Sequence, residues 1–381
     1  MISVKNIFSL SLIVFGFLSI FINRIYGSPV IYISLYIPAL VVFFLKVKNY
    51  KIVIPKFASK ILLFFSIYFI YSLFISSDIF STIKYFTMWI FNVIVMLSIY
   101  NISDSDKIIL NFLRVIAFFA IIGLLMFIIN YSPISNPFLL FDRNGYVFIL
   151  IISLALSLNK NYKLYSIIFF ISGLFTFSRT FLLMSLAALL FYSYKKFKFY
   201  SILKFILLII IFGFLLVFFN PYLFNRLNNA VILISTFLEY FSTNSIELAT
   251  NIDDSRRFYV TIANLNLIKF TFPFGTGMGT ENYLNYLHLY SSDFLNYTDH
   301  LGRAHNFYIS YLAEAGLLFF IFVNLLFKPL YLKTDILLRS FYFSLLIGIA
   351  TNEYITSPFV WFFIGILYKN SLNYDKIKLK E

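Results

Sequence analysis

The sequence predicts an all-α polytopic membrane protein, with about 12 transmembrane helices and one long external loop that contains short interfacial helices. Composition gives the first reason: the 381 residues are 61% hydrophobic and 12% charged, whereas a soluble domain holds about 25% charged residues. The second reason is that apolar runs alternate with short basic loops along the chain. The chain contains no Cys, which excludes disulfides and thiolate catalysis.

Twelve apolar runs are interpreted as helices. The first begins after Lys5 and has no small-residue cleavage site before Pro29, so we interpret it as a span and not as a signal peptide. Several runs fall short of the ~20 residues that a straight span needs. The runs are residues 7–22, 30–45, 61–75, 85–100, 108–129, 146–158, 164–177, 181–194, 202–219, 305–327, 336–350 and 354–368.

These runs define four regions. Residues 1–220 hold the first nine helices, residues 221–304 form the long external loop, residues 305–368 hold the last three helices, and residues 369–381 are a cytoplasmic tail. Two apolar stretches inside the loop are too short to span, and we predict interfacial or re-entrant helices there. A glycine-rich segment follows them and is predicted to be a turn, with an anion-binding loop as the alternative. These stretches are residues 230–241, 258–272 and 273–279.

The net charge of +14 does not indicate a nucleic-acid partner, because the basic residues lie between apolar runs and form no basic domain. If the amino terminus is cytoplasmic, 20 of the 30 Lys and Arg residues fall inside and 9 outside, with Arg114 near the inner end of its helix. This bias satisfies the positive-inside rule and places both termini in the cytoplasm. The inside residues are nearly all Lys, whereas the outside ones are mostly Arg, which grips phosphate through two parallel hydrogen bonds. Alternatively, the outside Arg residues pair with external carboxylates, or snorkel to the interface as Arg179 could.

The segment from Gly302 to Phe319 is where the polar external loop meets an apolar helix. It places Arg303, His305 and Asn306 at that boundary. A His side chain accepts a proton near neutral pH, and an Arg side chain holds an anion through a planar fork of donors. We therefore predict that a lipid-linked substrate reacts here, at the membrane surface. The alternative is that His305 caps the start of the helix or forms a hydrogen bond there.

Metal binding is not expected. The pair Asp104 and Asp106 lies in a short loop predicted inside, away from the other candidates. Asp253 and Asp254 are external but have no His or carboxylate at metal-ligand spacing. The sequence therefore predicts no metal ion and no other cofactor.

Four stretches carry a resemblance to a known family. Phe-Asp-Arg-Asn-Gly-Tyr (141–146) leads into a middle helix, and Phe-Ser-Arg-Thr (177–180) forms a turn on the outer side. Ser-Arg-Arg-Phe (255–258) precedes an amphipathic stretch and a Gly-Thr-Gly turn. His305-Asn306 is followed by nine residues and then Gly316. Together these stretches resemble the membrane family of O-antigen ligases and O-antigen or capsule repeat-unit polymerases, glycosyltransferases of the GT-C type.

The resemblance implies transfer of a glycan from an undecaprenyl-diphosphate donor to the terminal sugar hydroxyl of a lipid-linked acceptor, with inversion and without metal. The implied location is the outer face of the bacterial cytoplasmic (inner) membrane. The implied partners are the lipid-linked donor and acceptor, membrane lipids and a chain-length regulator, with no nucleic acid. Arg donors would stabilise the leaving diphosphate, and a His would act as the base. By the resemblance, His305 is the catalytic base, Arg179, Arg257, Arg256 and Arg303 bind the diphosphate, and Arg143, Asn306 and Glu314 have supporting roles.

Two alternatives to a polymerase stay open from the sequence. A ligase uses the same donor but transfers the glycan to lipid A core, giving lipopolysaccharide, or to protein. Phe319 stands where the ligase-type pattern has another Gly, and no Arg has the spacing of Arg, ten residues and Gly found in some polymerases. A lipid-linked oligosaccharide flippase belongs to another class. Such transporters usually show two similar halves with midplane sites, whereas this chain gathers its polar residues in one loop.

Overall fold

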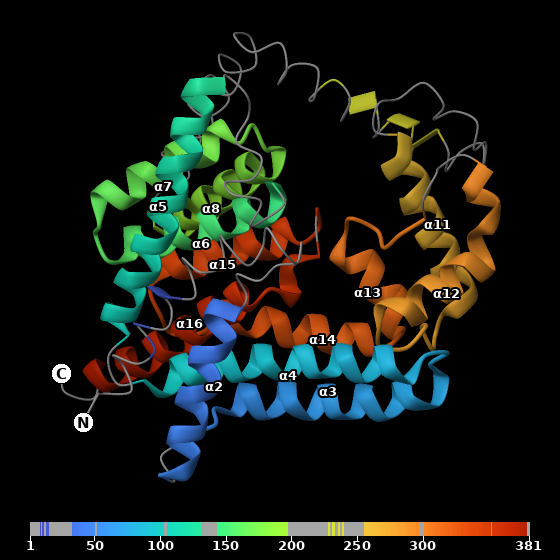
Figure 1. Cartoon of the computed structure of the whole chain (residues 1–381), viewed down its shortest axis with the longest axis horizontal. Coiled ribbons are helices and arrows are strands. Elements are labelled where there is room, and N and C mark those ends of the chain that lie inside the picture. The colour runs from blue at the N-terminus through green and yellow to red at the C-terminus, as the bar shows by residue number, and fades with distance from the viewer. Residues whose placement is uncertain are drawn as a thin grey trace.

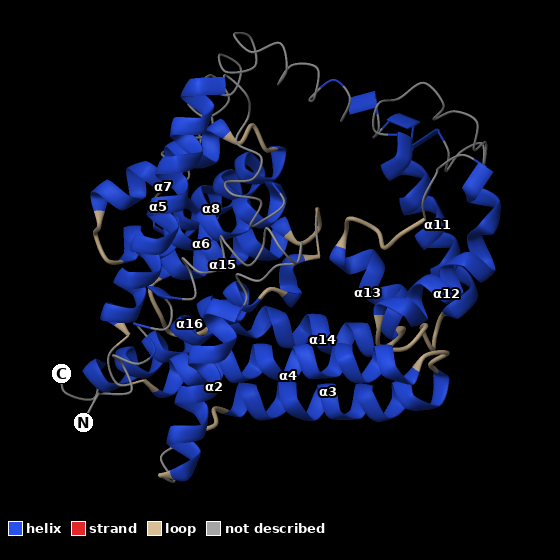
Figure 2. Cartoon of the chain, in the orientation of Figure 1, coloured by secondary structure: helices blue, strands red, loops and turns tan. Residues whose placement is uncertain are grey.

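The computed structural model describes residues 33–49, 52–102, 105–130, 143–196, 255–296, 301–351 and 353–378, together with isolated positions within 8–14 and 228–239. These residues form α-helices and short 3-10 helices and contain no strand (Figure 1 and Figure 2). The all-α prediction is therefore confirmed for this part of the chain. The helices predicted at residues 7–22, 202–219 and 230–241 lie outside the described residues, apart from those isolated positions.

Among the described residues, three helices are long and apolar enough to cross a membrane: α3 (Lys56–Ile75), α4 (Ile79–Asn101) and α5 (Asp106–Asn130). They confirm the helices predicted from the third, fourth and fifth apolar runs. α3 and α4 lie side by side as a hairpin along the bottom of Figure 1. Asp78 begins α4, because its carboxylate accepts hydrogen bonds from the amides of Phe80 and Ser81 at 2.9 and 3.1 Å.

Shorter apolar helices form a second group at the upper left of Figure 1: α6 (Arg143–Asn159), α7 (Lys163–Phe175), α8 (Arg179–Lys196) and α15 (Ile336–Gly348). Each corresponds to a predicted apolar run. Hydroxyl groups join α6 to α7, since the hydroxyls of Tyr146 and Ser172 are 2.9 Å apart and Ser166 donates to Ser157 at 2.9 Å. α15 packs against both α8 and α6.

Two further helices pack against α4, namely α2 (Ile33–Lys48) and α16 (Pro358–Lys378). α2 confirms the second predicted run. The last run was predicted to be helical from residue 354, but Tyr354–Thr356 first forms a 3-10 turn, and α16 begins at Pro358. Proline suits the first helical position because the missing amide would have no partner there.

The prediction of one helix over residues 305–327 is wrong. The structure has two helices there, α13 (Phe307–Ala315) and α14 (Leu318–Phe327), which are separated at Gly316. Gly316 has a φ of +54°, and a Cβ at this position would lie 2.1 Å from the carbonyl oxygen of Pro273. The helix therefore ends where glycine takes a left-handed conformation and the backbone meets the glycine-rich turn closely.

The region predicted as an external loop contains two α-helices where it is described, joined by the glycine-rich turn. α11 (Ser255–Thr271) confirms the helix expected over residues 258–272. α12 (Thr280–Ser291) was not predicted, because its sequence is rich in Asn and Tyr and has no apolar run. Asn282 docks α12 on the start of α4: its amide donates to Thr82 Oγ1 at 2.8 Å, and its Oδ1 accepts from the Asp78 amide at 2.6 Å.

Polar contacts gather at the two ends of α4. At one end, Lys369 donates to the carbonyl of Ile102, and nearby along the chain Lys160 pairs with Asp106, at the start of α5, at 2.7 Å. All of these residues belong to loops or a helix end predicted to be cytoplasmic. At the other end of α4 lie α12 and the glycine-rich turn, and the candidate site is on this side (Figure 1).

Candidate active site

The loop that carries His305 is fixed by hydrogen bonds to its backbone. Asn264 on α11 is fully buried, donates to the carbonyl of Gly302 at 3.0 Å and accepts from the amide of Ala304 at 3.2 Å. The hydroxyl of Ser310 donates to the carbonyl of Ala304 at 3.0 Å. The loop therefore has a defined conformation before α13 begins.

Asn306 is the residue that caps α13. Its side-chain oxygen accepts hydrogen bonds from the amides of Tyr308 and Ile309 at 2.9 and 3.2 Å, as an N-cap residue does. Asn306 is thus the N-cap residue of α13, and the role of His305 stays a prediction. His305 comes one residue before the cap and its side chain is exposed, so a substrate at the surface can reach the imidazole.

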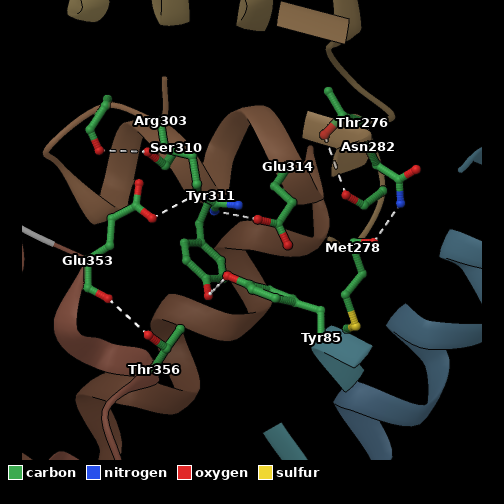
Figure 3. A network of polar contacts seen from close by, with 12 residues as sticks. Tyr85, Thr276, Met278, Asn282, Arg303, Ser310, Tyr311, Glu314, Glu353 and Thr356 are labelled. Atoms are coloured by element: carbon green, nitrogen blue, oxygen red, sulfur yellow. Dashed lines mark hydrogen bonds and ion pairs between the residues drawn. The ribbon is translucent and has the colours of Figure 1, made fainter. Parts of the chain in front are cut away.

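Arg303 lies between two carboxylates (Figure 3). Its Nη2 is 2.5 Å from Oε2 of Glu314, and its Nε is 2.7 Å from Oε2 of Glu353. Glu314 comes from α13 and is fully buried, whereas Glu353 comes from the segment between α15 and α16. The guanidinium therefore joins the loop to two other parts of the chain.

Tyrosines surround this ion-paired cluster. The ring centres of Tyr283, Tyr311 and Tyr85 lie 4.6, 5.4 and 5.7 Å from the guanidinium carbon of Arg303, within the range of cation–π attraction. The hydroxyls of Tyr85 and Tyr311 are 2.7 Å apart, and Figure 3 shows this contact. The rings come from α12, α13 and α4, so three helices enclose the guanidinium.

The positive charge of Arg303 is more than offset by its two partners. A diphosphate at this guanidinium would meet two carboxylates, and the low dielectric of a buried cluster strengthens that repulsion. The geometry therefore does not favour the diphosphate-binding role expected for Arg303 and gives it a structural role. Burial raises the pKa of the Glu353 carboxyl above its usual value, and the nearby guanidinium offsets part of this effect.

The segment between α15 and α16 connects the loop to the start of α8. The first amide of α13 donates to the carbonyl of Ile349 at 2.9 Å, and the hydroxyls of Thr351 and Thr180 are 3.1 Å apart. Arg179 precedes Thr180 as the first residue of α8 and is half-buried. The start of α8 and the loop that carries the imidazole are thus anchored to one short segment.

The remaining predicted Arg residues also begin helices. Arg143 is the first residue of α6, and Arg256 and Arg257 lie in the first turn of α11. The start of α6 packs closely on the segment after α15, since a Cβ on Gly145 would lie 3.0 Å from the ring of Tyr354. The side chains of these Arg residues lie outside the described residues, so their roles stay predictions. Asp104, Asp253 and Asp254, which were considered as metal ligands, also lie outside the described residues.

The glycine-rich turn is bonded to α13. The amides of Thr276 and Gly277 donate to the carbonyls of Ala313 and Glu314 at 3.0 Å each. These amides point at the end of a helix, which leaves the anion-binding alternative without its donors. The prediction of a plain turn is confirmed, and the turn's contribution is to position α13.

Sequence reasoning missed Glu353 and Asn264. Glu353 had a recognisable signal, because an acidic residue in a short gap between two apolar runs is a functional candidate. Asn264 had none, since nothing in the sequence indicates which loop it contacts. The tyrosines could not be singled out in a chain with 29 Tyr. The tyrosines around the cluster are Tyr85, Tyr283, Tyr311 and Tyr68. The hydroxyl of Tyr68 donates to Glu314 Oε1 at 3.2 Å.

Comparison with known families gives a match to a segment that contains part of this site. Residues 164–323 match the family model described as O-antigen ligase. The matched segment runs from α7 into α14 and includes Arg179, Arg257, Arg303, His305 and Gly316. The match supports the O-antigen ligase and polymerase family and, with the long apolar helices, indicates a membrane protein. No curated protein matches the chain.

Proposed function

We propose, from the O-antigen ligase domain at residues 164–323, that this chain is a membrane glycosyltransferase that polymerises lipid-linked repeat units. The donor is a glycan on undecaprenyl diphosphate, and the acceptor is the terminal sugar hydroxyl of a second lipid-linked glycan. The reaction takes place at the outer face of the bacterial cytoplasmic membrane. The observation that carries the proposal is an exposed His305 on a fixed loop that shares its anchor with the start of α8, where Arg179 lies.

His305 acts as the general base in this proposal. It removes the proton from the acceptor hydroxyl while the hydroxyl oxygen attacks the anomeric carbon of the donor sugar. The bond between that carbon and the diphosphate oxygen breaks, and the diphosphate leaves with the bonding electrons. Attack from the opposite face inverts the anomeric configuration. A diphosphate is already a good leaving group, so it needs charge stabilisation more than it needs a proton.

Arg residues at helix starts stabilise the leaving diphosphate. Arg179 is the first residue of α8, where the positive end of the helix dipole favours an anion. Arg257 and Arg256 occupy the first turn of α11 and are proposed as further phosphate ligands. Arg143, the first residue of α6, is proposed as a supporting group.

The test is glycan transfer by the purified full-length protein in lipid nanodiscs, supplied with one defined undecaprenyl-diphosphate oligosaccharide. We expect products that lengthen by whole repeat units. They should form equally with and without a chelator, because the proposed chemistry uses no metal ion. Transbilayer movement of the lipid without any new glycosidic bond would identify a flippase and overturn the proposal.

A ligase is the second candidate, because the matching family model is described as O-antigen ligase. It would use the same donor, base and phosphate ligands and differ only in its acceptor. Supplying lipid A core together with the lipid-linked repeat unit separates the two activities. Glycan on lipid A core without lengthened lipid-linked glycan would identify the ligase.

Replacing Arg179 with Ala should lower kcat/KM for the donor roughly 10-fold, because a hydrogen bond to a charged group contributes about 1.5–3 kcal/mol. Arg179→Lys should retain part of this activity, since Lys keeps the charge but loses the paired donors. Steady-state kinetics with varied donor concentration measure both effects. Arg114→Ala is the matched control, because Arg114 is an exposed Arg on α5, and it should not change donor kinetics. Unchanged donor kinetics in Arg179→Ala would remove Arg179 from phosphate binding.

A further inference from the structure

We infer that Glu353 is a positioning residue for the proposed reaction and that, through Arg303, it fixes the loop that presents His305. The catalytic consequence of this inference rests on the proposed function. Its structural part rests on the contacts of the described residues alone.

The first step concerns which parts of the chain the cluster joins. Glu314 belongs to α13, the helix into which the His305 loop leads, so its pair with Arg303 is local. Glu353 lies 50 residues beyond Arg303 in the sequence, and its carboxylate is 2.7 Å from Nε of Arg303. This second pair therefore ties the loop to an independent segment of the fold.

The second step concerns what that segment holds. Thr351 comes two residues before Glu353, and its hydroxyl oxygen lies 3.1 Å from the hydroxyl oxygen of Thr180 at the start of α8. The segment that contains Thr351 and Glu353 therefore contacts both the helix that begins with Arg179 and the loop that carries the proposed base. Glu353 adds a side-chain contact to the backbone bond between the Phe307 amide and the Ile349 carbonyl. The distance between base and leaving group depends on this connection, and a displacement of about 1 Å can cost roughly 10²-fold in rate.

The third step concerns charge. One carboxylate is enough to neutralise Arg303, and burying a second one carries a desolvation cost. In addition, Nη1 of Arg303 is buried without a hydrogen-bond partner among the described residues. A cluster built only for stability would avoid both features. Two carboxylates on two different nitrogens of one guanidinium, Nη2 and Nε, do, however, fix its orientation, because hydrogen bonds to a planar guanidinium are directional.

The test uses purified full-length protein with Glu353→Gln, Glu353→Asp, Arg303→Gln and the double variant of Glu353→Gln with Arg303→Gln. Donor kinetics are combined with amide hydrogen exchange over residues 301–309 and with diethylpyrocarbonate modification of His305. His288 is exposed on α12 and serves as the internal reference for modification. Neither exchange nor modification requires glycan transfer.

We expect Glu353→Gln to lower kcat about 10- to 100-fold, with a donor KM within about two-fold of the original value. Exchange over residues 301–309 should accelerate, and the modification rate of His305 relative to His288 should change. Glu353→Asp should restore part of the turnover because it keeps the carboxylate. The double variant should be no worse than Arg303→Gln, since Glu353 acts through Arg303.

Several outcomes would overturn the inference. Lost turnover with unchanged exchange in the loop would mean that Glu353 acts directly, and a loosened loop with full turnover would remove its catalytic relevance. Accelerated exchange in α12 as well would mean that Glu353 supports the whole fold. If the unaltered protein transfers no glycan, the proposed function fails, and the exchange and modification data still decide whether Glu353 fixes the loop.

Discussion

His305→Ala should abolish polymer formation and leave the protein folded and inserted in the membrane. A positioned His contributes roughly 10²–10⁴-fold as a general base. Because the His305 side chain is exposed, its removal creates no cavity in the core. The loss should fall on kcat with little change in the donor KM, since the imidazole acts on the acceptor proton in the transition state. Turnover of the purified protein with one defined lipid-linked repeat unit measures the effect.

His288→Ala is the matched control, because it removes another exposed imidazole, on α12. It should retain full turnover. His305→Gln keeps a side chain that can hydrogen-bond but cannot accept the proton, so it should be as inactive as His305→Ala. Long polymers from either His305 variant would show that another group is the base.

His305 and Arg179 could be proposed as site residues from the sequence because the chemistry of these residues is local. An imidazole at a loop-to-helix boundary and an Arg between two apolar runs can be recognised without knowing their neighbours. Arg303 shows where this reasoning stops. The same reasoning predicted that Arg303 binds phosphate. In the structure Arg303 forms ion pairs with Glu314 and with Glu353, which lies 50 residues away in sequence. Partners at that separation are set by tertiary structure.

The helices of the fold also differ in how far the sequence could predict them. A long apolar run is sufficient to indicate a helix, and α3, α4 and α5 were predicted for that reason. α12 was missed because it is held by tertiary contacts such as the Asn282 side chain on the start of α4, and its own sequence has no apolar run. α13 and α14 were joined because hydropathy carries no information about the backbone angle at Gly316.

Gly316→Ala should lower the free energy of unfolding by roughly 3 kcal/mol, the combined effect of a strained left-handed residue and of overpacking. The added Cβ would lie 2.1 Å from the carbonyl oxygen of Pro273, which is backbone and cannot turn aside. The backbone around Gly316 is also hydrogen-bonded to this carbonyl, since Leu317 N donates to Pro273 O at 3.0 Å. Moving them apart would therefore break the contact between α13 and the glycine-rich turn. Thermal unfolding in detergent at one fixed scan rate measures the change.

Comparing Gly277→Ala with Gly316→Ala separates the cost of backbone strain from the cost of a steric clash with backbone atoms. Gly277 has a φ of +83°, but its added Cβ would meet the side chain of Ile75 at 3.1 Å, and this side chain can move. It should cost only about 1–2 kcal/mol, the penalty of a left-handed conformation for a residue other than glycine. Equal unfolding temperatures for the two variants would mean that strain alone limits this corner. A lower temperature for Gly316→Ala would mean that close backbone contact holds α13, and with it the His305 loop, in place.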